Sequence, residues 1–552
     1  MNPVPVIPAP VRAEPLEGSW RICDGSSVAG PPEVADIVRL FVDDVRADTG
    51  LELVVSTGVD SDIRVELDAS GLDDLPGAAG VRADGDAGAD ERYCLEVRET
   101  VALVRGASRE AVHRGLTTLR QLITAGEGDV AGVRILDAPR FAWRGLSLDV
   151  ARTFHDVETV ERVIDMCSLH KLNVLHLHLT DDPGWRFEVP GWPLLTEVGG
   201  AGALGDRPGG HYSRDDVARL VGYAADRFVT IVPEVDMPGH SGAVFRSYPG
   251  LAPEPSAAAE QAAAIGMAIG ALDLDRCTTR RFVSDVLAAV VEQFTTSAYV
   301  HIGADEAFGM ADDEHAAFVE FAVAEVRHFG RRAIGWQEAA RGPVGPDEIV
   351  QYWLEPVETE RMLGTGMLEA MMPPEVAPLV EATMRTSLTD VPRALERGAR
   401  VLVSPTTRLY FDRPHLDEGA DEEQEARRQR LGLPFYPPTS LRDMVEWDPV
   451  TETPGVADDS RLAGVEAAVW CETVADRDDL EALLLPRLPG AAERAWSAAA
   501  TEWDGYVSRL AAQTPAWDRR DWAWFRPAFL DRATAGVVHG GPAAGTVSTT
   551  AV

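Results

Sequence analysis

The chain has 552 residues, a formal net charge of −38, 45% hydrophobic residues and 25% charged residues. This is the composition of a globular protein, and the length suffices for two domains. The acidic excess disfavours nucleic acids and anionic membrane surfaces as partners, because like charges repel.

Residues 1–138 have the pattern of a small α/β accessory domain. Alternating β-branched and apolar residues predict strands at 51–57 and 62–69 and a hairpin over YCLEVRE and VALVRGA. Residues 107–125 have the apolar spacing of a helix, and the Gly- and Asp-rich stretch 71–90 predicts a surface loop. The proline in DAPRFAW and the change of pattern there place the domain boundary.

Residues 139–530 alternate short apolar runs with helical segments. The runs are WRGLSLDVA, NVLHLHLTD, FVTIVPEVD, YVHIGADE, RAIGWQEA, EIVQYW, ARVLVSP and VEAAVWCE. Continuous apolar strands that alternate with helices predict a parallel sheet covered on both faces, and eight such units predict a closed (β/α)₈ TIM barrel. Polar residues gather at the C-terminal ends of the runs, where the active sites of such barrels lie.

Several segments lie outside this pattern. Residues 413–460 form a long insertion after the seventh run, with no function indicated beyond a solvated surface, and residues 531–552 are predicted to be a disordered tail. The five cysteines lack CxxC spacing, so neither a disulfide framework nor a zinc site is indicated. No signal sequence and no apolar run of membrane-spanning length is seen, and we therefore expect a cytoplasmic protein.

Polar and aromatic side chains follow the predicted barrel strands. They are Asp149, Arg152, His176, His178, Asp181, Asp182, Glu234, Asp236, His240, Asp305, Glu306, Trp336, Glu338, Trp353, Tyr410, Asp412, Trp470 and Glu472. Taken singly, each carboxylate has an ordinary explanation as a helix cap or ion-pair partner, and each tryptophan as a core residue. Together on one face, aromatic rings suit the apolar faces of sugars and charged groups suit their hydroxyls. The set therefore predicts a carbohydrate ligand.

Asp305 and Glu306 are adjacent at the end of the run YVHIGADE. Glycoside cleavage needs an acid that protonates the leaving oxygen and a second group that attacks or stabilises the anomeric centre. Successive strand residues point to opposite sides, so these neighbours would not flank one bond as acid and nucleophile. The adjacency favours a nucleophile that the protein does not supply.

The ordered motifs LDVARTF, NVLHLHLTDDPGW, IVPEVDMPGHSGAVF, YVHIGADE, GWQE, QYW, LYFD and VWCE closely resemble those of the family 20 glycoside hydrolases, the β-N-acetylhexosaminidases. The resemblance runs from near residue 90 to PRLPGAAERAWS at 486–497. It implies a retaining exo-acting enzyme that removes terminal β-linked GlcNAc or GalNAc from small carbohydrates, such as chitin oligosaccharides or glycoconjugates. The substrate's own acetamido oxygen would attack to give an oxazolinium intermediate, and no cofactor or metal is implied.

The resemblance also assigns roles to individual residues. Glu306 would be the general acid and then base, Asp305 would orient the acetamido N–H, and Tyr410 would donate to the acetamido oxygen. The residues expected to bind the substrate are Arg152, Trp336, Trp353, Asp412, Trp470 and Glu472, with Asp181 and His240 supporting Glu306. Two positions depart from the family pattern, Ala304 in place of a glycine and Pro183 in place of a glutamine, and both bear on substrate fit.

Two other functions are left open by the residues. His176 and His178 resemble the HxH ligands of metal-dependent amidohydrolase barrels. However, the pair lies on the second run and the only lysine, Lys171, precedes it, which favours structural hydrogen bonding. A non-catalytic sugar-binding protein is the other alternative, against which the joint presence of Asp305, Glu306 and Tyr410 argues. The natural aglycone, the GlcNAc or GalNAc preference and the oligomeric state cannot be read from the sequence.

Overall fold

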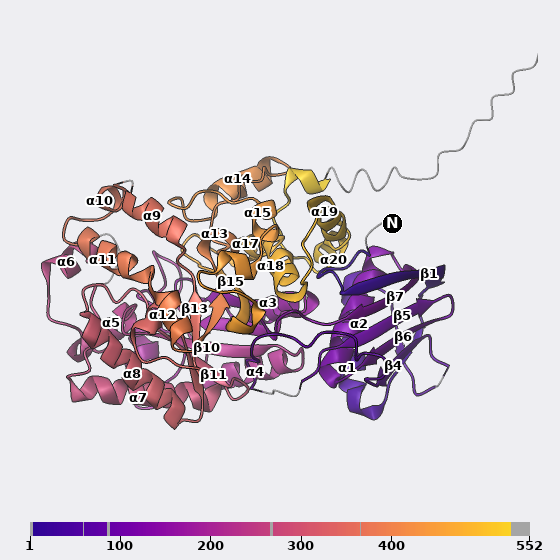
Figure 1. The fold of residues 1–552 in the computed structure, drawn as a ribbon, viewed down its shortest axis with the longest axis horizontal. Coiled ribbons are helices and arrows are strands. Elements are labelled where there is room, and N and C mark those ends of the chain that lie inside the picture. The colour runs from indigo at the N-terminus through magenta and orange to yellow at the C-terminus, as the bar shows by residue number, and fades with distance from the viewer. Residues whose placement is uncertain (1–3, 59, 86–88, 265–268, 365, 532–552) are drawn as a thin grey trace, which may run out of the picture.

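The computed structural model describes residues 4–58, 60–85, 89–264, 269–364 and 366–531. They form an N-terminal α/β domain and a barrel domain that lie next to each other along the long axis of the molecule (Figure 1). The predicted boundary at residue 138 falls between the last strand of the first domain and the first strand of the barrel. The predicted tail lies outside the described residues, except for its first residue.

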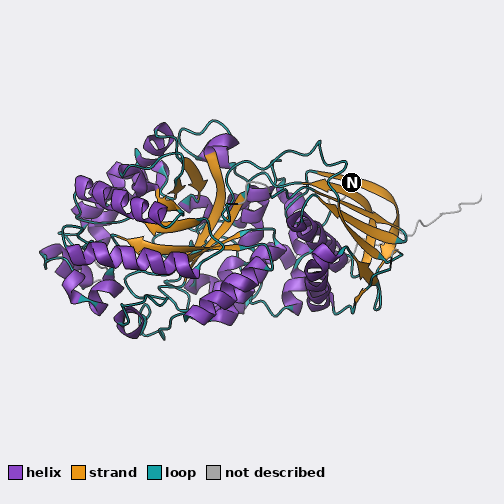
Figure 2. Cartoon of the chain, turned by 90° about the horizontal axis from the view of Figure 1, so that it is seen from below, coloured by secondary structure: helices purple, strands orange, loops and turns teal. Residues whose placement is uncertain are grey.

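The first domain is a seven-stranded sheet with helices packed against it. The strand order is β1 (Arg12–Arg21), β7 (Asp129–Asp137), β5 (Tyr93–Arg98), β6 (Val101–Gly106), β4 (Ile63–Leu67), β2 (Ser27–Ala29) and β3 (Val54–Val55). Figure 2 shows that helices lie between this sheet and the barrel. They include α1 (Ala35–Thr49) and α2 (Arg109–Ala125), the latter capped by Ser108, whose side chain accepts from the backbone N–H of Ala111. The predicted hairpin and the second helix are confirmed, whereas β1, β2, α1 and β7 were not predicted.

The second domain is a closed barrel of eight parallel strands. They are β8 (Trp143–Asp149), β9 (Val174–His178), β10 (Thr230–Met237), β11 (Tyr299–Gly303), β12 (Arg332–Trp336), β13 (Ile349–Tyr352), β14 (Arg400–Val403) and β15 (Leu462–Val469). Each strand overlaps one of the predicted runs, so the predicted TIM barrel is confirmed. All residues of β8, β9, β11, β13 and β15 are buried, because helices cover the outside and side chains fill the inside.

The helices of the barrel domain fall into two groups. Those following the strands on the outside are α3 (Val157–Leu169), α4 (Arg214–Ala225), α7 (Cys277–Gln293), α8 (Asp312–His328), α12 (Asp390–Glu396), α17 (Arg477–Leu484) and α18 (Arg487–Trp496). Additional helices are α5 (Gly242–Ser247), α6 (Ala257–Ala263), α9 (Pro356–Gly364), α10 (Met367–Met371), α11 (Ala377–Ser387), α13 (Thr406–Leu409), α14 (Glu422–Arg430), α15 (Leu441–Val445), α16 (Pro449–Glu452), α19 (Trp503–Ala511) and α20 (Thr514–Arg519). Among the described residues, no helix has the length and apolar character needed to cross a membrane.

A segment of the first domain closes the N-terminal end of the barrel. Residues 79–85 were predicted to belong to a surface loop, which holds for the exposed Asp84 and Gly85 but is wrong for Ala83. Ala83 is 3% exposed and packs among the first residues of the barrel strands, and its carbonyl accepts from the N–H of Ala298 at 2.8 Å. Gly80 has φ +92°, and a Cβ there would lie 2.0 Å from the carbonyl oxygen of Ala463. Only glycine therefore lets the segment approach the barrel this closely.

Candidate active site

Asp305 and Glu306 lie in a turn of rarely adopted backbone conformation just after β11. Positive φ angles occur at Gly303 (67°), Ala304 (74°) and Glu306 (46°). At Gly303 a Cβ would lie 1.7 Å from Oδ1 of Asp236, so the turn requires glycine there. The turn gives the adjacent carboxylates different surroundings, since the Asp305 side chain is 12% exposed whereas the Glu306 side chain is 34% exposed.

Ala304 occupies the position where the family pattern has a glycine. Its left-handed φ costs an alanine about 1 kcal/mol relative to a glycine. Its backbone N–H donates to the carbonyl of Met237 at 3.0 Å, and its methyl group is fully buried in the barrel core. The packing around the methyl group holds the turn in this conformation.

His240 joins the two carboxylates to the barrel interior. Its Nε2 lies 3.4 Å from Oε2 of Glu306 and 3.7 Å from Oδ2 of Asp305, and its Nδ1 lies 3.4 Å from Oδ1 of Asp181. Burial lowers the pKa of His240, but the carboxylates of Asp181 and Asp236 raise that pKa by more, to well above its usual range. The ring is therefore a cation at neutral pH and attracts both carboxylates of the turn.

Asp305 combines burial with an open acceptor atom. Its Oδ1 is buried and has no hydrogen-bond partner within the described part of the chain. Burial and the nearby carboxylate of Asp236 raise the pKa of Asp305 well above its usual range. A buried acceptor of this kind is suited to a ligand N–H, because the hydrogen bond would offset the cost of its desolvation.

Four aromatic side chains form a box beside Asp305. The ring centroids of Trp336 and Trp470 are 5.8 Å apart, and those of Tyr410 and Trp470 are 6.0 Å apart. Trp353 lies 6.3 Å from Tyr410, with the two ring planes only 8° apart. Burial raises the pKa of Tyr410 well above its usual range, so the hydroxyl keeps its proton and stays a donor. The box offers flat apolar walls and one polar group, as a small amide or a sugar ring requires.

A charged cluster borders the same box. Arg152 lies 2.8 Å from Asp181, 3.2 Å from Glu472 and 3.3 Å from Asp149, and its guanidinium lies 5.1 Å from the ring centre of Trp470. Both carboxylate oxygens of Asp412 and Oε2 of Glu472 are buried without a hydrogen-bond partner in the described ranges. Burial is the main cause of the raised pKa of Asp412 and of Glu472. These acceptors are placed to bind hydroxyl groups of a ligand.

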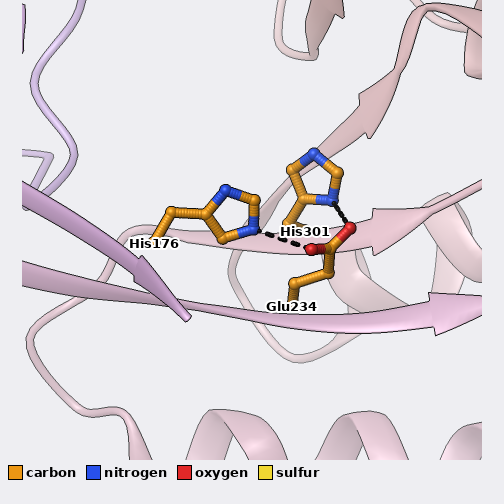
Figure 3. Close-up of side chains that lie close together, drawn as sticks. All are labelled: His176, Glu234 and His301. Atoms are coloured by element: carbon orange, nitrogen blue, oxygen red, sulfur yellow. Dashed lines mark ion pairs between the residues drawn. The ribbon is translucent and has the colours of Figure 1, made fainter. Parts of the chain in front are cut away.

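Glu234 is the centre of a buried network inside the barrel. His176 and His301 both face its carboxylate, at 3.1 Å and 2.9 Å respectively (Figure 3). Its Oε1 also accepts from Nε1 of Trp336 at 2.8 Å. Glu234 therefore fixes the orientation of Trp336, which is one wall of the box.

The histidines of the HxH pair make carboxylate contacts on both ring nitrogens. His176 lies 2.9 Å from Glu466 and 3.1 Å from Glu234, while His178 lies 2.5 Å from Glu234 and 2.9 Å from Asp181. Burial lowers the pKa of His176, but Glu234 and Glu466 raise it to about 9. Burial also lowers the pKa of His178, but Glu234 and Asp181 raise it by more, to well above its usual range. Because each ring nitrogen of the two histidines lies within 3.1 Å of a carboxylate oxygen, these contacts favour the structural role.

The remaining strand-end residues stabilise local structure. Asp149 accepts from the backbone N–H groups of Ala151 and Arg152, and Asp182 accepts from that of Gly242 at the start of α5. The carbonyl of Pro183 accepts from Arg246 at 3.0 Å.

Glu338 accepts from Nε1 of Trp353 at 3.1 Å. Burial raises the pKa of Glu338 to about 8. Glu338 thus orients the wall of the box nearest the solvent.

Tyr436 belongs to the site although the sequence did not indicate it. It lies in the 413–460 insertion and, with Glu306 and Trp353, lines a cavity of about 180 Å³. Burial and the charges of Asp412, Glu472 and Glu306 raise the pKa of its hydroxyl well above the usual range. The one sequence signal was an aromatic pair, PFYPP, within a polar segment.

Comparisons with known proteins cover nearly the whole chain. The model of the glycosyl hydrolase family 20 catalytic domain matches residues 141–499, and that of family 20 domain 2 matches residues 4–138. A β-N-acetylhexosaminidase of Cellulomonas fimi is 35% identical over 536 residues, which cover 95% of this chain and 96% of that protein. The solved family 20 β-N-acetylhexosaminidase of Streptomyces coelicolor A3(2) has a TM-score of 0.78 at 30% identity, covering 95% of this chain and 98% of that one. The Streptomyces plicatus N-acetyl-β-hexosaminidase in complex with Thio-NAglucal has a TM-score of 0.77 at 30% identity, with coverages of 95% and 97%.

Proposed function

Because the chain belongs to glycosyl hydrolase family 20, we propose that it is a retaining, exo-acting β-N-acetylhexosaminidase that releases terminal β-linked GlcNAc or GalNAc. The resemblance inferred from the motifs is confirmed, and the protein is a glycoside hydrolase acting on small carbohydrates. One observation carries the assignment of the chemistry to particular residues. Asp305, with a buried open acceptor, lies beside an aromatic box and directly before the partly exposed Glu306.

The acetamido group of the substrate acts as the nucleophile in this proposal. Its N–H donates to Oδ1 of Asp305, and its oxygen accepts from the hydroxyl of Tyr410. The box holds the group so that its oxygen faces the anomeric carbon, which keeps this intramolecular attack in a productive geometry. The Asp305 carboxylate then stabilises the positive charge that develops as the oxazolinium ring closes.

Glu306 moves the protons. It protonates the glycosidic oxygen as the bond to the aglycone breaks, and its carboxylate then takes a proton from the water that opens the oxazolinium. The contact with His240 fixes the side chain in place, and Asp181 holds the histidine. The two successive displacements at the anomeric carbon leave its configuration retained.

The charged cluster binds the hydroxyls of the terminal sugar. Asp412 and Glu472 accept hydrogen bonds, and Arg152 donates. Asp412 is buried, whereas the side chains of Arg152 and Glu472 are 16% and 23% exposed, and we infer that the three groups close the pocket beyond the terminal ring. We attribute exo action to this closure, because a longer chain would have to displace the Arg152–Glu472 ion pair.

Hydrolysis of p-nitrophenyl β-GlcNAc and β-GalNAc tests the proposal. We expect release of p-nitrophenol, and proton NMR of the first product should show the β-anomer. The Glu306→Gln variant is the control and should have lower activity. Absence of turnover on both glycosides would refute the proposal, and binding without turnover would support the sugar-binding alternative.

A cytoplasmic location is a separate proposal. All five cysteines are free, and Cys94, Cys167 and Cys471 are buried, which suits a reducing compartment. Fractionation of the producing cells should find the intact protein with the soluble cell contents. Its recovery mainly from the culture medium would overturn the proposal.

A further inference from the structure

The connection between β13 and β14 contains more helices than a barrel unit needs. A single helix suffices to return the chain between parallel strands, and α12 leads into β14 here. Helices α9, α10 and α11 come before it, directly after the C-terminal end of β13. They lie at the end of the molecule far from the N-terminal domain (Figure 1). The connection therefore extends from the edge of the barrel at which catalytic groups lie.

These helices enclose the cavity of about 180 Å³ that Glu306, Trp353 and Tyr436 also line. Its apolar lining consists mainly of Phe308, Leu354, Met362, Met372, Val380 and Met384. Half of these side chains are methionines, which are flexible and adapt to ligands of different shape. The cavity thus continues from the proton donor into an apolar space.

Most polar side chains at the edge of the cavity are bound to other groups of the protein, although Oε1 of Glu338 is buried without a hydrogen-bond partner among the described residues. Glu358 accepts from Arg361 at 2.7 Å and pairs with Arg413 at 3.2 Å. Thr406 donates its hydroxyl to the carbonyl of Trp353 at 2.7 Å. These contacts hold α9 against the site and use polar groups that would otherwise face a ligand.

We propose that this cavity binds the aglycone of the substrate and that this aglycone is a small apolar group, alkyl or aryl, in preference to a second sugar. The inference rests on the proposed function, because Glu306 must face the leaving oxygen for the cavity to receive the aglycone. An apolar cavity of about 150 Å³ is large enough to hold benzene, so the volume suits such a group. The hydroxyls of a sugar would lose water on entry without gaining enough partners.

A comparison of methyl β-GlcNAc, hexyl β-GlcNAc and N,N′-diacetylchitobiose tests the proposal. The two alkyl alcohols have similar leaving ability, so a difference in kcat/KM reports contacts of the chain. We expect hexyl to exceed methyl by at least about tenfold, since each buried methylene contributes several-fold. Chitobiose should be a poorer substrate than the hexyl glycoside.

Variants in the methionine pair at the end of α10 provide the matched control. Met372 lines the cavity, whereas Met371 is 45% exposed. Met372→Gln should lower the hexyl-to-methyl ratio of kcat/KM at least threefold, and Met362→Gln should do the same. Met371→Gln should leave the ratio unchanged.

Equal kcat/KM for hexyl and methyl glycosides of the parent protein would overturn the proposal, and so would a preference for chitobiose over hexyl. That comparison needs no variant, so it decides the matter even where a substitution prevents folding. Failure to cleave any GlcNAc glycoside, p-nitrophenyl included, would instead refute the proposed function. The two failures are therefore distinguishable.

Discussion

His240 Nε2 lies 3.4 Å from Oε2 of Glu306, and this contact ties the partly exposed carboxylate to a half-buried cation. The side chain is thereby held at the mouth of the site, where a leaving oxygen would lie. Glu306→Gln keeps the shape and removes the proton donor. We expect kcat/KM for chitobiose to fall about 10³-fold, within the range for general acid–base catalysis.

The loss should be much smaller for 2,4-dinitrophenyl β-GlcNAc, because that leaving group departs without protonation. Glu320→Gln, on the exposed side of α8, should behave as the parent. An equal loss on both substrates would contradict the assignment of Glu306 as the acid.

Asp305 should control the acid limb of the pH profile. Its pKa is raised by burial and by Asp236, and it must be ionised to stabilise the oxazolinium. As pH falls through this raised pKa, the carboxylate gains a proton and kcat/KM declines, at a pH above the usual range of an aspartate. Asp305→Asn should remove this limb and lower kcat about 10²–10³-fold, as loss of one preorganised electrostatic group does. An unchanged acid limb in the variant would show that another group titrates.

Asp236 should make the protein less stable as pH rises. Burial raises its pKa from the ordinary 3.8 to about 7 in the folded state, and its oxygens lack hydrogen-bond partners among the described residues. The unfolded chain ionises first as pH rises, so stability falls between these values and then levels off. Asp236→Asn removes this dependence, so the unfolding free energy of the variant relative to that of the parent should be about 4 kcal/mol higher at pH 8 than at pH 4.

Urea unfolding at the two pH values measures this difference. Asp215→Asn, at an exposed position of α4, is the control and should show none. A variant that loses stability equally at both pH values would mean that Asp236 serves packing alone.

Tyr436→Phe tests the residue contributed by the insertion. The ring lies 4.9 Å from the Arg413 guanidinium, and the hydroxyl lies in the field of Asp412 and Glu472. Removing the hydroxyl should raise KM about tenfold, because a factor of ten in binding corresponds to the free energy of one hydrogen bond to a charged group. The change in kcat should be smaller. Unchanged kinetics on chitobiose and p-nitrophenyl β-GlcNAc would exclude Tyr436 from the site.

Chelation tests the histidine pair directly. Since both ring nitrogens of His176 and His178 contact carboxylates, we expect dialysis against EDTA to leave kcat and KM unchanged. Loss of activity on dialysis and its return with Zn²⁺ would favour the metal-dependent alternative. Metal analysis of the purified protein gives an independent reading.

The barrel could be predicted because each of its strands is buried on both faces and therefore appears in the sequence as a continuous apolar run. β1 could not, because it is an edge strand of largely exposed residues, RAEPLEGSWR, held by its backbone pairing with β7. α1 did carry a usable signal in the spacing of Ile37, Phe41 and Val45.

Some residues of the site could likewise be predicted from the sequence and others could not. Strand ends converge in any closed barrel, so Asp305, Trp336 and Trp470 follow from the fold. Tyr436 and the cavity behind Glu306 depend on how irregular segments pack, and no periodicity in the sequence encodes that. The turn at Gly303 likewise depends on contact with Asp236, which is 67 residues away in sequence.

The segment 79–85 makes the catalytic barrel inseparable from its accessory domain. A gene fragment starting at residue 139 would encode every strand of the barrel yet lack the backbone that pairs with Ala298 and Ala463. The first apolar layer, around Trp143 and Tyr299, would then face water. The accessory domain thus supplies the cap that keeps the N-terminal end of the barrel dry, and the barrel is structurally complete only together with it.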